Sequence, residues 1–340
     1  MTTGVTLGKY APLHRGHQLV IETIIAEQDE AIVIIYDTDV TDVPLPVRAN
    51  WIRLLYPEVR VIEAWDGPTG IDHDPAYEQA EERYVRSLLD DTEVTAFYCS
   101  EYYGAHMAQA LGAIDRRVDV NRFQVPISST IIRSNPYAYR KFVDPIVYRD
   151  LVTKVVFLGA MSTGKSTLTE VLAARYATTF ASEYGRDYWA EHQVDRRITL
   201  AGFDEIATGH IEREDEAIKD ANRYFFVDTN AMTTYLYALD YHGRAPSLLT
   251  RLAEENATRY DLFFLCGDDI PYDDTWDRSG VGKRSVFQRQ IIADLHQRKI
   301  PYIVLTGTLE ERIVKVDEIL AAYRPYSNFF GAQASSEAPN

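Results

Sequence analysis

The sequence predicts an α/β protein with two domains, each built on a parallel β-sheet. Short apolar segments alternate with longer amphipathic ones along most of the 340 residues, and the alternation starts afresh near residue 154 with a glycine-rich phosphate-binding pattern. A chain of this length is also longer than one hydrophobic core usually organises. We expect a first domain over residues 1–150, a second over residues 151–325, and a disordered, small and polar tail over residues 326–340.

The first domain is expected to contain five strands separated by helices. Apolar runs bounded by polar residues predict the strands, and apolar residues at helical spacing predict the helices. The expected strands are residues 5–7, 31–36, 60–64, 94–98 and 117–120, and the expected helices are residues 16–26, 46–55, 75–89 and 103–111. Strands that are joined through helices lie parallel, which explains the predicted sheet.

The second domain repeats this alternation after a connecting stretch over residues 135–150. Its expected strands are residues 154–158, 224–227, 261–265 and 302–305, and the helices between them include residues 165–176 and 200–220. Residues 267–284 are rich in charged side chains and stand between a strand and a helix. We expect this segment to form a mobile lid.

The composition excludes several classes of protein. The net charge of −16 and the isoelectric point near 5.0 argue against nucleic-acid binding, which requires clustered Lys and Arg. Neither a run of 18 apolar residues nor a signal-peptide pattern occurs, so we expect a cytoplasmic protein with no membrane partner. Cys99 and Cys266 end apolar runs, and we expect both to be reduced, buried and structural. A homo-oligomer is compatible with the sequence.

Residues 159–167, GAMSTGKST, match the Walker A pattern G-x-x-x-x-G-K-[ST] between an expected strand and an expected helix. In that setting backbone N–H groups wrap the β-phosphate of a nucleotide, the lysine reaches the β and γ oxygens, and the hydroxyl after it ligates Mg²⁺. Here these side chains are Lys165 and Ser166. The predicted ATP-binding residues of this domain are Gly159, Ser162, Thr163, Gly164, Lys165, Ser166 and Thr167.

A second candidate phosphate site lies near the N-terminus. His14, Gly16 and His17 stand where an expected strand passes into an expected helix. Gly16 permits close approach of the backbone to a ligand, and both histidines can face the same phosphates. The alternatives are a metal pair, for which no further ligands are spaced nearby, and two surface histidines.

The segment ISSTIIR, residues 127–133, begins another expected helix. Ser128 to Thr130 can cap that helix and bind phosphate, and Arg133 supplies a fixed positive charge. Together the two patterns resemble the HxGH and ISSTxxR motifs of the nucleotidyltransferase superfamily. The resemblance implies a Rossmann-like nucleotidyltransferase fold, in which the histidines and Arg133 bind ATP phosphates and stabilise adenylyl transfer without a covalent intermediate.

More of this domain resembles the nicotinamide-mononucleotide adenylyltransferase half of bifunctional NadR-type proteins. The resemblance rests on the segments GKYAPLH, RANW, SEYYG, VDVNR and RSNP, which begin at residues 8, 48, 100, 118 and 133. It implies that Lys9 lies among the phosphates of both substrates. The ATP-binding residues that it implies are Gly8, Lys9, His14, Gly16, His17, Ser128, Ser129, Thr130 and Arg133.

Trp51 and Tyr84 are the predicted nicotinamide contacts of this domain. Trp51 can equally be a core residue of the helix over residues 46–55. The family usually has a tryptophan in the helix that corresponds to residues 75–89, where this chain offers only Tyr77 and Tyr84.

Residues 154–323 resemble the ribosylnicotinamide kinase half of the same proteins, which has a P-loop kinase fold. The segments EYGR, FVDTN and YDDTWDRS, which begin at residues 183, 226 and 272, carry this resemblance. It implies that Glu183 binds the ribose hydroxyls and acts as general base, and that Asp228 organises Mg²⁺ and the acceptor. Tyr272 would stack on the nicotinamide, and Arg278 would stabilise charge from the lid. Two weaker phosphate candidates are Arg186 and Arg284, and the alternative for Glu183 and Arg186 is a surface ion pair.

The combined prediction is a bifunctional NAD salvage enzyme that uses ATP and Mg²⁺. It would convert nicotinamide riboside to nicotinamide mononucleotide and then adenylylate the mononucleotide to NAD. The predicted catalytic residues are His14, His17, Lys9, Arg133, Lys165, Glu183, Asp228 and Arg278. The nearest rival is a fused phosphopantetheine adenylyltransferase and dephospho-coenzyme A kinase, which the EYGR, FVDTN and lid segments disfavour. An NAD-sensing transcriptional regulator is disfavoured by the negative charge and by a first strand at residue 5, which leaves no room for a helix-turn-helix before it.

Overall fold

The structure is a computed structural model that describes residues 1–68, 75–101, 104–195, 197–272 and 281–326. The described residues divide into two compact units, one formed by residues 1–148 with residues 324–326, and one formed by residues 149–323. Each unit has a five-stranded sheet in which every recorded strand pair is parallel. The predicted α/β fold with two parallel sheets is confirmed.

The first unit centres on β1 (Thr3–Gly8), which pairs with β2 (Glu30–Tyr36) and β4 (Ala96–Cys99). β3 (Arg60–Ala64) and β5 (Ile114–Arg117) complete the order β3-β2-β1-β4-β5. The strand order reverses beside β1, and open α/β sheets bind ligands in the crevice at such a point. The helices are α1 (Arg15–Glu27), α2 (Leu45–Leu55), α3 (Pro75–Leu89), α4 (Gly104–Leu111), α5 (Ser129–Ser134), the 3₁₀ turn η1 (Arg140–Phe142) and α6 (Pro145–Leu151).

The apolar composition of these strands explains their interior position. The four residues 32–35 of β2 are fully buried, as expected for a parallel sheet that is covered on both faces. One hydrophobic core joins Val5 of β1 to Val85 of α3 and Met107 of α4. α1 packs on β1 and β2.

The structure corrects the position of the fifth strand and adds short helices to the connecting stretch. The fifth strand forms at Ile114–Arg117 and pairs with β4, three residues before the expected range of 117–120. Its exposed and polar sequence gives little apolar signal, which a strand at the edge of a sheet tolerates. The connecting stretch over residues 135–150 contains η1 and most of α6, helices too short for an apolar pattern to predict.

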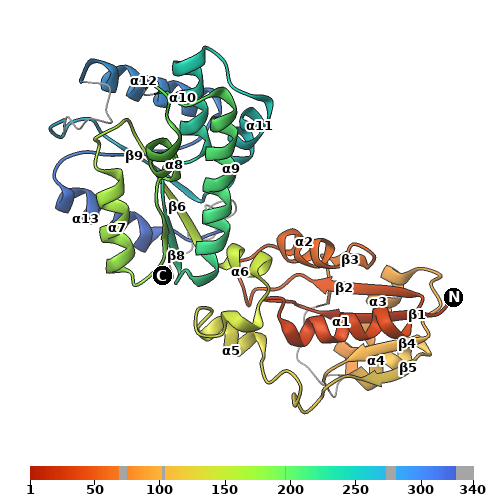
Figure 1. Cartoon of the computed structure of the whole chain (residues 1–340). Coiled ribbons are helices and arrows are strands. Elements are labelled where there is room, and N and C mark those ends of the chain that lie inside the picture. Colours follow the sequence, from red (N-terminus) through yellow and green to blue (C-terminus); the bar gives the residue numbers. More distant parts are fainter. Residues whose placement is uncertain (69–74, 102–103, 196, 273–280, 327–340) are drawn as a thin grey trace, which may run out of the picture. The chain divides into compact units, whose positions relative to one another are not determined.

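The second unit centres on β6 (Thr153–Leu158), which lies between β8 (Tyr224–Asp228) and β9 (Leu262–Cys266). β7 (Phe180–Ala181) and β10 (Ile303–Leu305) complete the order β10-β9-β6-β8-β7. Figure 1 shows α7 and α13 on one side of β6 and β8, and α9 on the other. The helices are α7 (Lys165–Arg175), α8 (Tyr184–His192), α9 (Leu200–Ala217), the 3₁₀ turn η2 (Ile218–Asp220), α10 (Ala231–His242), α11 (Ser247–Asn256), α12 (Val281–Gln297) and α13 (Leu309–Ala322).

Two apolar clusters stabilise this unit. In the first, Phe157 stacks on Phe226 and Phe264, with ring centroids 6.1 and 5.6 Å apart, and the sheet packs on α7 and α13. The second lies among α8, α9, α10 and α11. The buried face of α9 that contributes to this cluster also carries two ionisable side chains, His210 and Glu214, both 2% exposed. Charged groups at such positions require partners.

Cys99 and Cys266 are both free and buried, as predicted. Within the described part of the chain, every helix is too short or too polar to span a bilayer. The residues 281–284 of the expected lid belong to α12. Residues 273–280 of that lid and residues 327–340 of the expected tail lie outside the described residues.

Candidate active sites

The loop between β6 and α7, called the P-loop below, has the backbone of a phosphate cradle. Gly159, Ser162 and Gly164 have φ angles of 148°, 61° and 82°, and alternation of this kind turns successive N–H groups toward one point. A Cβ at Gly159 would lie 2.7 Å from the hydroxyl of Thr163, so a larger residue would disrupt the loop. Lys165 is buried, and its Nζ donates to the carbonyl of Ala160 at 3.1 Å, so its ammonium lies against the loop.

Two buried arginines outside this loop hold its carbonyl groups. Nη2 of Arg284 donates to the carbonyl of Ser162 at 3.0 Å, and Nη1 of Arg312 donates to the carbonyl of Thr163 at 2.7 Å. A trans peptide directs its C=O and N–H in opposite directions. Because the arginines hold the C=O groups of these two peptides, the N–H groups of Thr163 and Gly164 point away from the arginines. Arg284, a predicted phosphate candidate, thus donates to the backbone of the loop, and Arg312, which no sequence pattern singles out, does the same.

Ser166 and Asp228, the two predicted magnesium ligands, are in contact with each other. The hydroxyl of Ser166 donates to Oδ2 of Asp228 at 2.5 Å, and Asp228 is 2% exposed. Oδ1 of Asp228 has no hydrogen-bond partner among the described residues, which is costly for a buried carboxylate unless a cation or donor meets it. Mg²⁺ is usually held by one or two protein oxygens together with phosphates and water. The pair fits that ion, and no cluster of three or more His, Cys, Asp or Glu ligands occurs in the described ranges.

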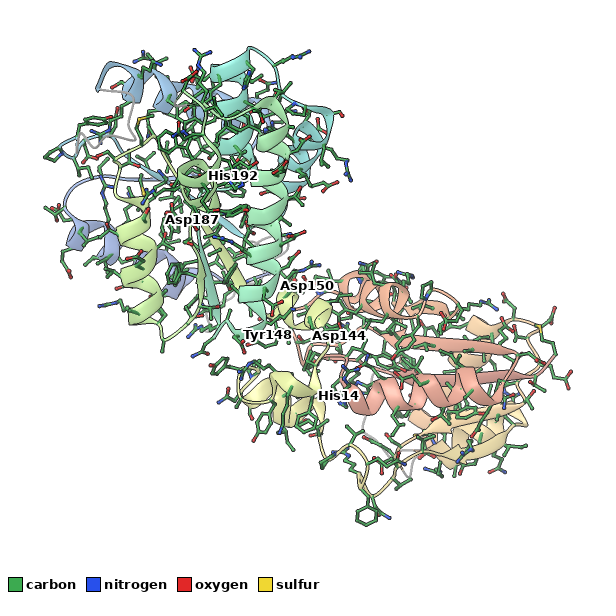
Figure 2. All side chains as sticks on the ribbon, viewed as in Figure 1. His14, Asp144, Tyr148, Asp150, Asp187 and His192 are labelled. Carbon is green, nitrogen blue, oxygen red and sulfur yellow. The ribbon has the colours of Figure 1, made fainter. Side chains whose placement is uncertain are left out.

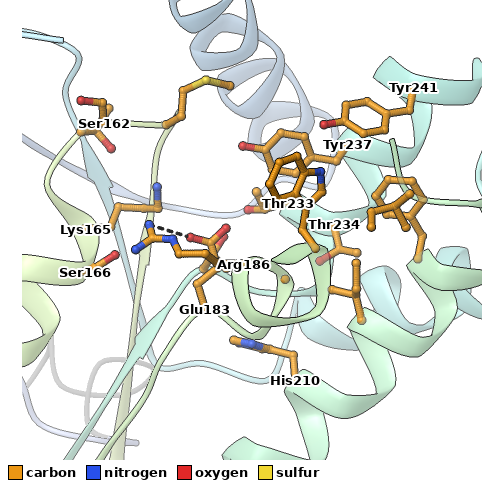
Figure 3. Close-up of a pocket in the computed structure, with 18 of the residues that line it drawn as sticks. Ser162, Lys165, Ser166, Glu183, Arg186, His210, Thr233, Thr234, Tyr237 and Tyr241 are labelled. Carbon is orange, nitrogen blue, oxygen red and sulfur yellow. Dashed lines mark hydrogen bonds and ion pairs between the residues drawn. The ribbon is translucent and has the colours of Figure 1, made fainter. Parts of the chain in front are cut away.

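Glu183 stands at the N-cap of α8 and faces the P-loop across a cavity of about 270 Å³ (Figure 3). Its side chain is 24% exposed, and Oε2 lies 3.5 Å from Nη2 of Arg186. The expected ion pair therefore exists, and its carboxylate also lines the cavity. Burial raises the pKa of Glu183, repulsion from Asp228 adds to this, and the positive charges of Lys165 and Arg186 oppose it. A carboxyl group with a raised pKa is suited to accept a proton.

The end of this cavity away from the P-loop is apolar and aromatic (Figure 3). Side chains from α8, α9, α10 and the chain before α9 form it: Trp189, Ile198, Phe203, Ile206, Tyr237 and Tyr241. The polar lining includes His210, Thr229, Thr233 and Thr234. The sequence does not distinguish these residues, because along the chain they have the spacing of ordinary core positions.

Tyr272 does not belong to this lining. Its hydroxyl lies 3.8 Å from Sδ of Met161, and the guanidinium of Arg284 lies 5.8 Å from its ring centroid. The ring expected to stack on nicotinamide therefore packs beside the P-loop. Arg278, expected to stabilise charge, lies outside the described residues.

The first unit contains a cavity of about 800 Å³ and an adjoining one of about 170 Å³. They share His17, Ser129 and Thr130. The larger is also lined by Gly8, Lys9 and Arg133, and the smaller by His14, Gly16 and Ser128. The structure thus brings all the expected ATP-binding residues of this unit together, although they come from opposite ends of its sequence.

His14 and His17 lie at the start of α1, with His14 labelled in Figure 2. Nδ1 of His14 accepts the N–H of Gly16 at 3.1 Å, and the two imidazole rings stack with centroids 3.8 Å apart. Burial, assisted by the positive charge of Arg122, lowers the pKa of His14 to about 4. Burial and the neighbouring His14 and Arg122 lower the pKa of His17 well below its ordinary value. Both rings are therefore uncharged at neutral pH.

The positive charges of this site come from Lys9, Arg122 and Arg133, which all line the larger cavity. Nη1 of Arg133 donates to the carbonyl of Ala11 at 2.6 Å, and Nη2 donates to the hydroxyl of Thr130 at 3.2 Å. The side chain of Ser128 caps α5, as predicted. Arg133 is therefore held by the loop after β1 and by its own helix.

The predicted nicotinamide contact of Trp51 is wrong. Trp51 is 1% exposed within α2 and lines neither cavity, so it is a core residue. Tyr84 packs against the core cluster and is also absent from the lining, whereas Tyr77 on the same helix is part of it. Glu81 and His106, which no sequence pattern singles out, also line the larger cavity. Nε2 of His106 lies 3.5 Å from Oε2 of Glu81.

Comparison with known proteins decides the family. A family model described as an AAA domain matches residues 154–312. The trifunctional NAD biosynthesis/regulator protein NadR of Escherichia coli (strain K12) is 30% identical over 327 residues, which cover 89% of this chain and 78% of that protein. The chain belongs to the NadR family.

Solved structures of NadR share the fold. One NadR protein, in complex with NAD and AMP-PNP, is 21% identical, with a TM-score of 0.54 over 99% of this chain and 98% of that chain. Another, in complex with NR, is 22% identical, with a TM-score of 0.54 over 94% of this chain and 95% of that chain. As a NadR protein, the chain is an enzyme of NAD biosynthesis that combines a nucleotidyltransferase with a kinase.

Proposed function

We propose that this protein makes NAD from nicotinamide riboside in two ATP-dependent steps. The second unit phosphorylates the 5′-hydroxyl of the riboside, giving nicotinamide mononucleotide and ADP. The first unit transfers the adenylyl group of ATP to that mononucleotide, giving NAD and pyrophosphate. One observation carries the proposal: the P-loop, Ser166 and Glu183 line the same cavity, and the other end of that cavity is aromatic. NadR relatives bound to NR, or to NAD and an ATP analogue, support the same substrates.

In the kinase reaction, Glu183 accepts the proton of the 5′-hydroxyl as that oxygen attacks the γ-phosphorus. Lys165 and the P-loop N–H groups bind the phosphate oxygens. Ser166 and Asp228 would hold Mg²⁺, which supplies charge neutralisation on the β- and γ-phosphates when bound. Arg186, whose side chain is 54% exposed at the edge of the cavity, remains a candidate phosphate ligand, as does Arg278.

In the adenylyl transfer, His14, His17, Lys9 and Arg133 bind the phosphates of ATP and stabilise the charge that develops on them. The mononucleotide phosphate attacks the α-phosphorus directly, so catalysis consists of positioning and electrostatic stabilisation. Bound phosphates raise the pKa of a neighbouring imidazole. Binding of ATP to this unit should therefore be accompanied by proton uptake at the two histidines.

We assign adenylyl transfer to residues 1–150 and phosphorylation to residues 151–325. The nicotinamide ring of the riboside is placed at the aromatic end of the kinase cavity, against Trp189 and Tyr237, where flat apolar surface is available. Tyr272 remains a candidate contact from beside the P-loop. In the first unit, Tyr77 takes the place expected of Trp51 and Tyr84.

Chromatography of the products formed from nicotinamide riboside, ATP and Mg²⁺ tests the proposal. NAD that forms after a transient mononucleotide supports both reactions and their order. Mononucleotide that accumulates without NAD would contradict the assignment of the first unit. If neither product forms, the salvage proposal is wrong, and phosphopantetheine becomes the next substrate to try.

Single substitutions separate the two sites. Lys165→Ala should abolish phosphorylation and leave adenylyl transfer to supplied mononucleotide intact, whereas His17→Ala should do the reverse. Each variant is the control for the other, because both proteins retain one active unit. Loss of both activities from one correctly folded variant would contradict the two-site proposal.

A further inference from the structure

A buried polar chain runs behind the kinase cavity. It consists of His210 and Glu214 on α9, Asn256 at the end of α11, and Tyr260 just before β9. All four side chains are buried. Figure 3 shows His210 extending from its helix toward the segment that carries Glu183. Buried polar groups of this kind have a defined geometry only when each is satisfied.

One end of this polar chain of side chains holds the backbone beside Glu183. Nδ1 of His210 accepts the N–H of Tyr184 at 3.4 Å, and Nε2 of His210 lies 3.2 Å from Oε1 of Glu214. From these two contacts we assign the tautomer with its proton on Nε2. The carboxylate of Glu214 attracts the Nε2 proton electrostatically, although Nε2 makes no aligned hydrogen bond among the described residues, and Nδ1 is left as the acceptor for Tyr184, the residue that follows Glu183.

The other end holds the backbone just beyond Asp228. The single proton of the Tyr260 hydroxyl is shared in a three-centre hydrogen bond, donated to Oε1 of Glu214 at 2.8 Å and to Oδ1 of Asn256 at 3.1 Å. The same oxygen of Asn256 accepts the N–H of Ala231 at 3.3 Å. Ala231 is the first residue of α10, shortly after the strand that ends with Asp228. The polar chain therefore links the backbones that carry the two carboxylates of the kinase site.

The negative charge of Glu214, at the centre of the polar chain, is compensated by a neighbouring positive charge. Nε of Arg259 donates to Oε2 of Glu214 at 2.8 Å. Burial alone would raise the pKa of Glu214, but His210 and Arg259 lower it below its ordinary value, so the carboxylate stays ionised. Burial, together with this negative charge, raises the pKa of Tyr260, which keeps its proton for donation. Glu214 is thus paired with Arg259 and accepts from Tyr260, which together fix the orientation of its carboxylate.

We propose that His210, Glu214, Asn256 and Tyr260, together called the bracket, set the separation of Glu183 and Asp228 for phosphoryl transfer. The inference rests on the proposed kinase function. Glu214, Asn256 and Tyr260 do not line the kinase cavity, so they act through the backbones of Tyr184 and Ala231 as positioning residues. Phosphoryl transfer depends on positioning, and supporting groups behind a catalytic constellation must hold it within about 0.5 Å.

Tyr260→Phe tests the bracket by removing the one hydroxyl that joins Glu214 to Asn256. We expect kcat for phosphorylation of nicotinamide riboside to fall about tenfold or more, as for other residues that orient catalytic ligands. The KM for ATP should stay within about twofold, because the P-loop is held by other contacts. Tyr224→Phe is the matched control, since it removes another buried hydroxyl of the same unit, bonded at 3.4 Å to the carbonyl of Leu320. Adenylyl transfer by the same preparations reports the integrity of the first unit.

Hydrogen exchange gives a readout that needs no substrate. The amides of Tyr184 and Ala231 should exchange faster in Tyr260→Phe than in the wild type or in Tyr224→Phe. A folded Tyr260→Phe with wild-type kcat overturns the proposal, and so does an equal loss of kcat in both variants, which would indicate general destabilisation. If the wild type does not phosphorylate the riboside, the proposed function fails. The exchange rates then still decide the bracket, because unchanged rates overturn it and faster rates support it.

Discussion

Replacing His14 with asparagine should make the stability of the first unit less dependent on pH. His14 caps α1 through Nδ1 and has a folded-state pKa of about 4, against an ordinary value of 6.5. The amide oxygen of asparagine can accept the same N–H of Gly16, because asparagine is a favoured N-cap residue. The substitution therefore retains the cap and removes the titration.

The sign of the effect follows from proton binding. Below pH 6.5 the unfolded chain binds a proton at His14 that the folded protein does not bind, so the wild type loses stability as the pH falls toward 4. The loss amounts to about 2 kcal/mol at pH 5 and about 3 kcal/mol at pH 4. Above pH 7 the imidazole is uncharged in both states. The difference between variant and wild type at pH 7.5 then reports the change in packing alone and serves as the internal reference.

Urea-dependent hydrogen exchange, followed in peptides from β1 and β2, measures the unfolding free energy of this unit separately from the other. This is necessary because a protein with two units is not expected to unfold in one step. Relative to the wild type, the variant should gain about 2 kcal/mol in unfolding free energy between pH 7.5 and pH 5. A difference that stays constant across this range would refute the conclusion that His14 is buried and uncharged.

Three further substitutions test separate parts of the two sites. Asp228→Asn should lower kcat of the kinase by about 100-fold or more, because the amide is a poor ligand for Mg²⁺. ADP release measured over a range of Mg²⁺ concentrations checks this expectation. Full activity of the variant at high Mg²⁺ would contradict it. Trp51→Ala should destabilise the first unit by about 3 kcal/mol in urea unfolding without changing the KM for the mononucleotide; a raised KM in a protein of wild-type stability would restore the discarded nicotinamide contact. Trp189→Ala should raise the KM for nicotinamide riboside about tenfold in initial-rate assays while the KM for ATP is unchanged. An effect confined to ATP would place Trp189 at the nucleotide instead.

Features that depend on a few neighbouring residues were predictable from sequence. The Walker A loop needs its positive φ angles and its lysine within one short segment, and GAMSTGKST provides both. The stacked pair of His14 and His17 follows from a three-residue spacing at the start of a helix. Apolar runs such as residues 31–36 identified the buried strands, because a parallel sheet that is covered on both faces requires them.

Features that depend on packing between distant helices were not predictable. An apolar or aromatic residue on the inner face of a helix has the same sequence spacing whether it borders a core or a cavity. The sequence therefore suggests a ligand contact for the core residue Trp51 and does not distinguish Trp189 and Tyr237 from core residues. Likewise, His210 and Glu214 look like an ordinary pair one helical turn apart. Their partners, Asn256 and Tyr260, come from another helix and a loop, and only the folded chain brings the four together.

The arginines behind the P-loop have a consequence for how the kinase responds to ionic strength. Arg284 and Arg312 each donate to a backbone carbonyl of the P-loop, and Arg312 is also paired with Asp269 at 2.7 Å, so they aim peptide dipoles at the phosphate position instead of offering their own charges. Oriented dipoles in a partly enclosed loop are screened by dissolved ions much less than exposed cations are. Nucleotide binding by the second unit should therefore weaken only modestly as salt is added. A protein that carries a net charge of −16 can in this way still attract a polyanion to the P-loop.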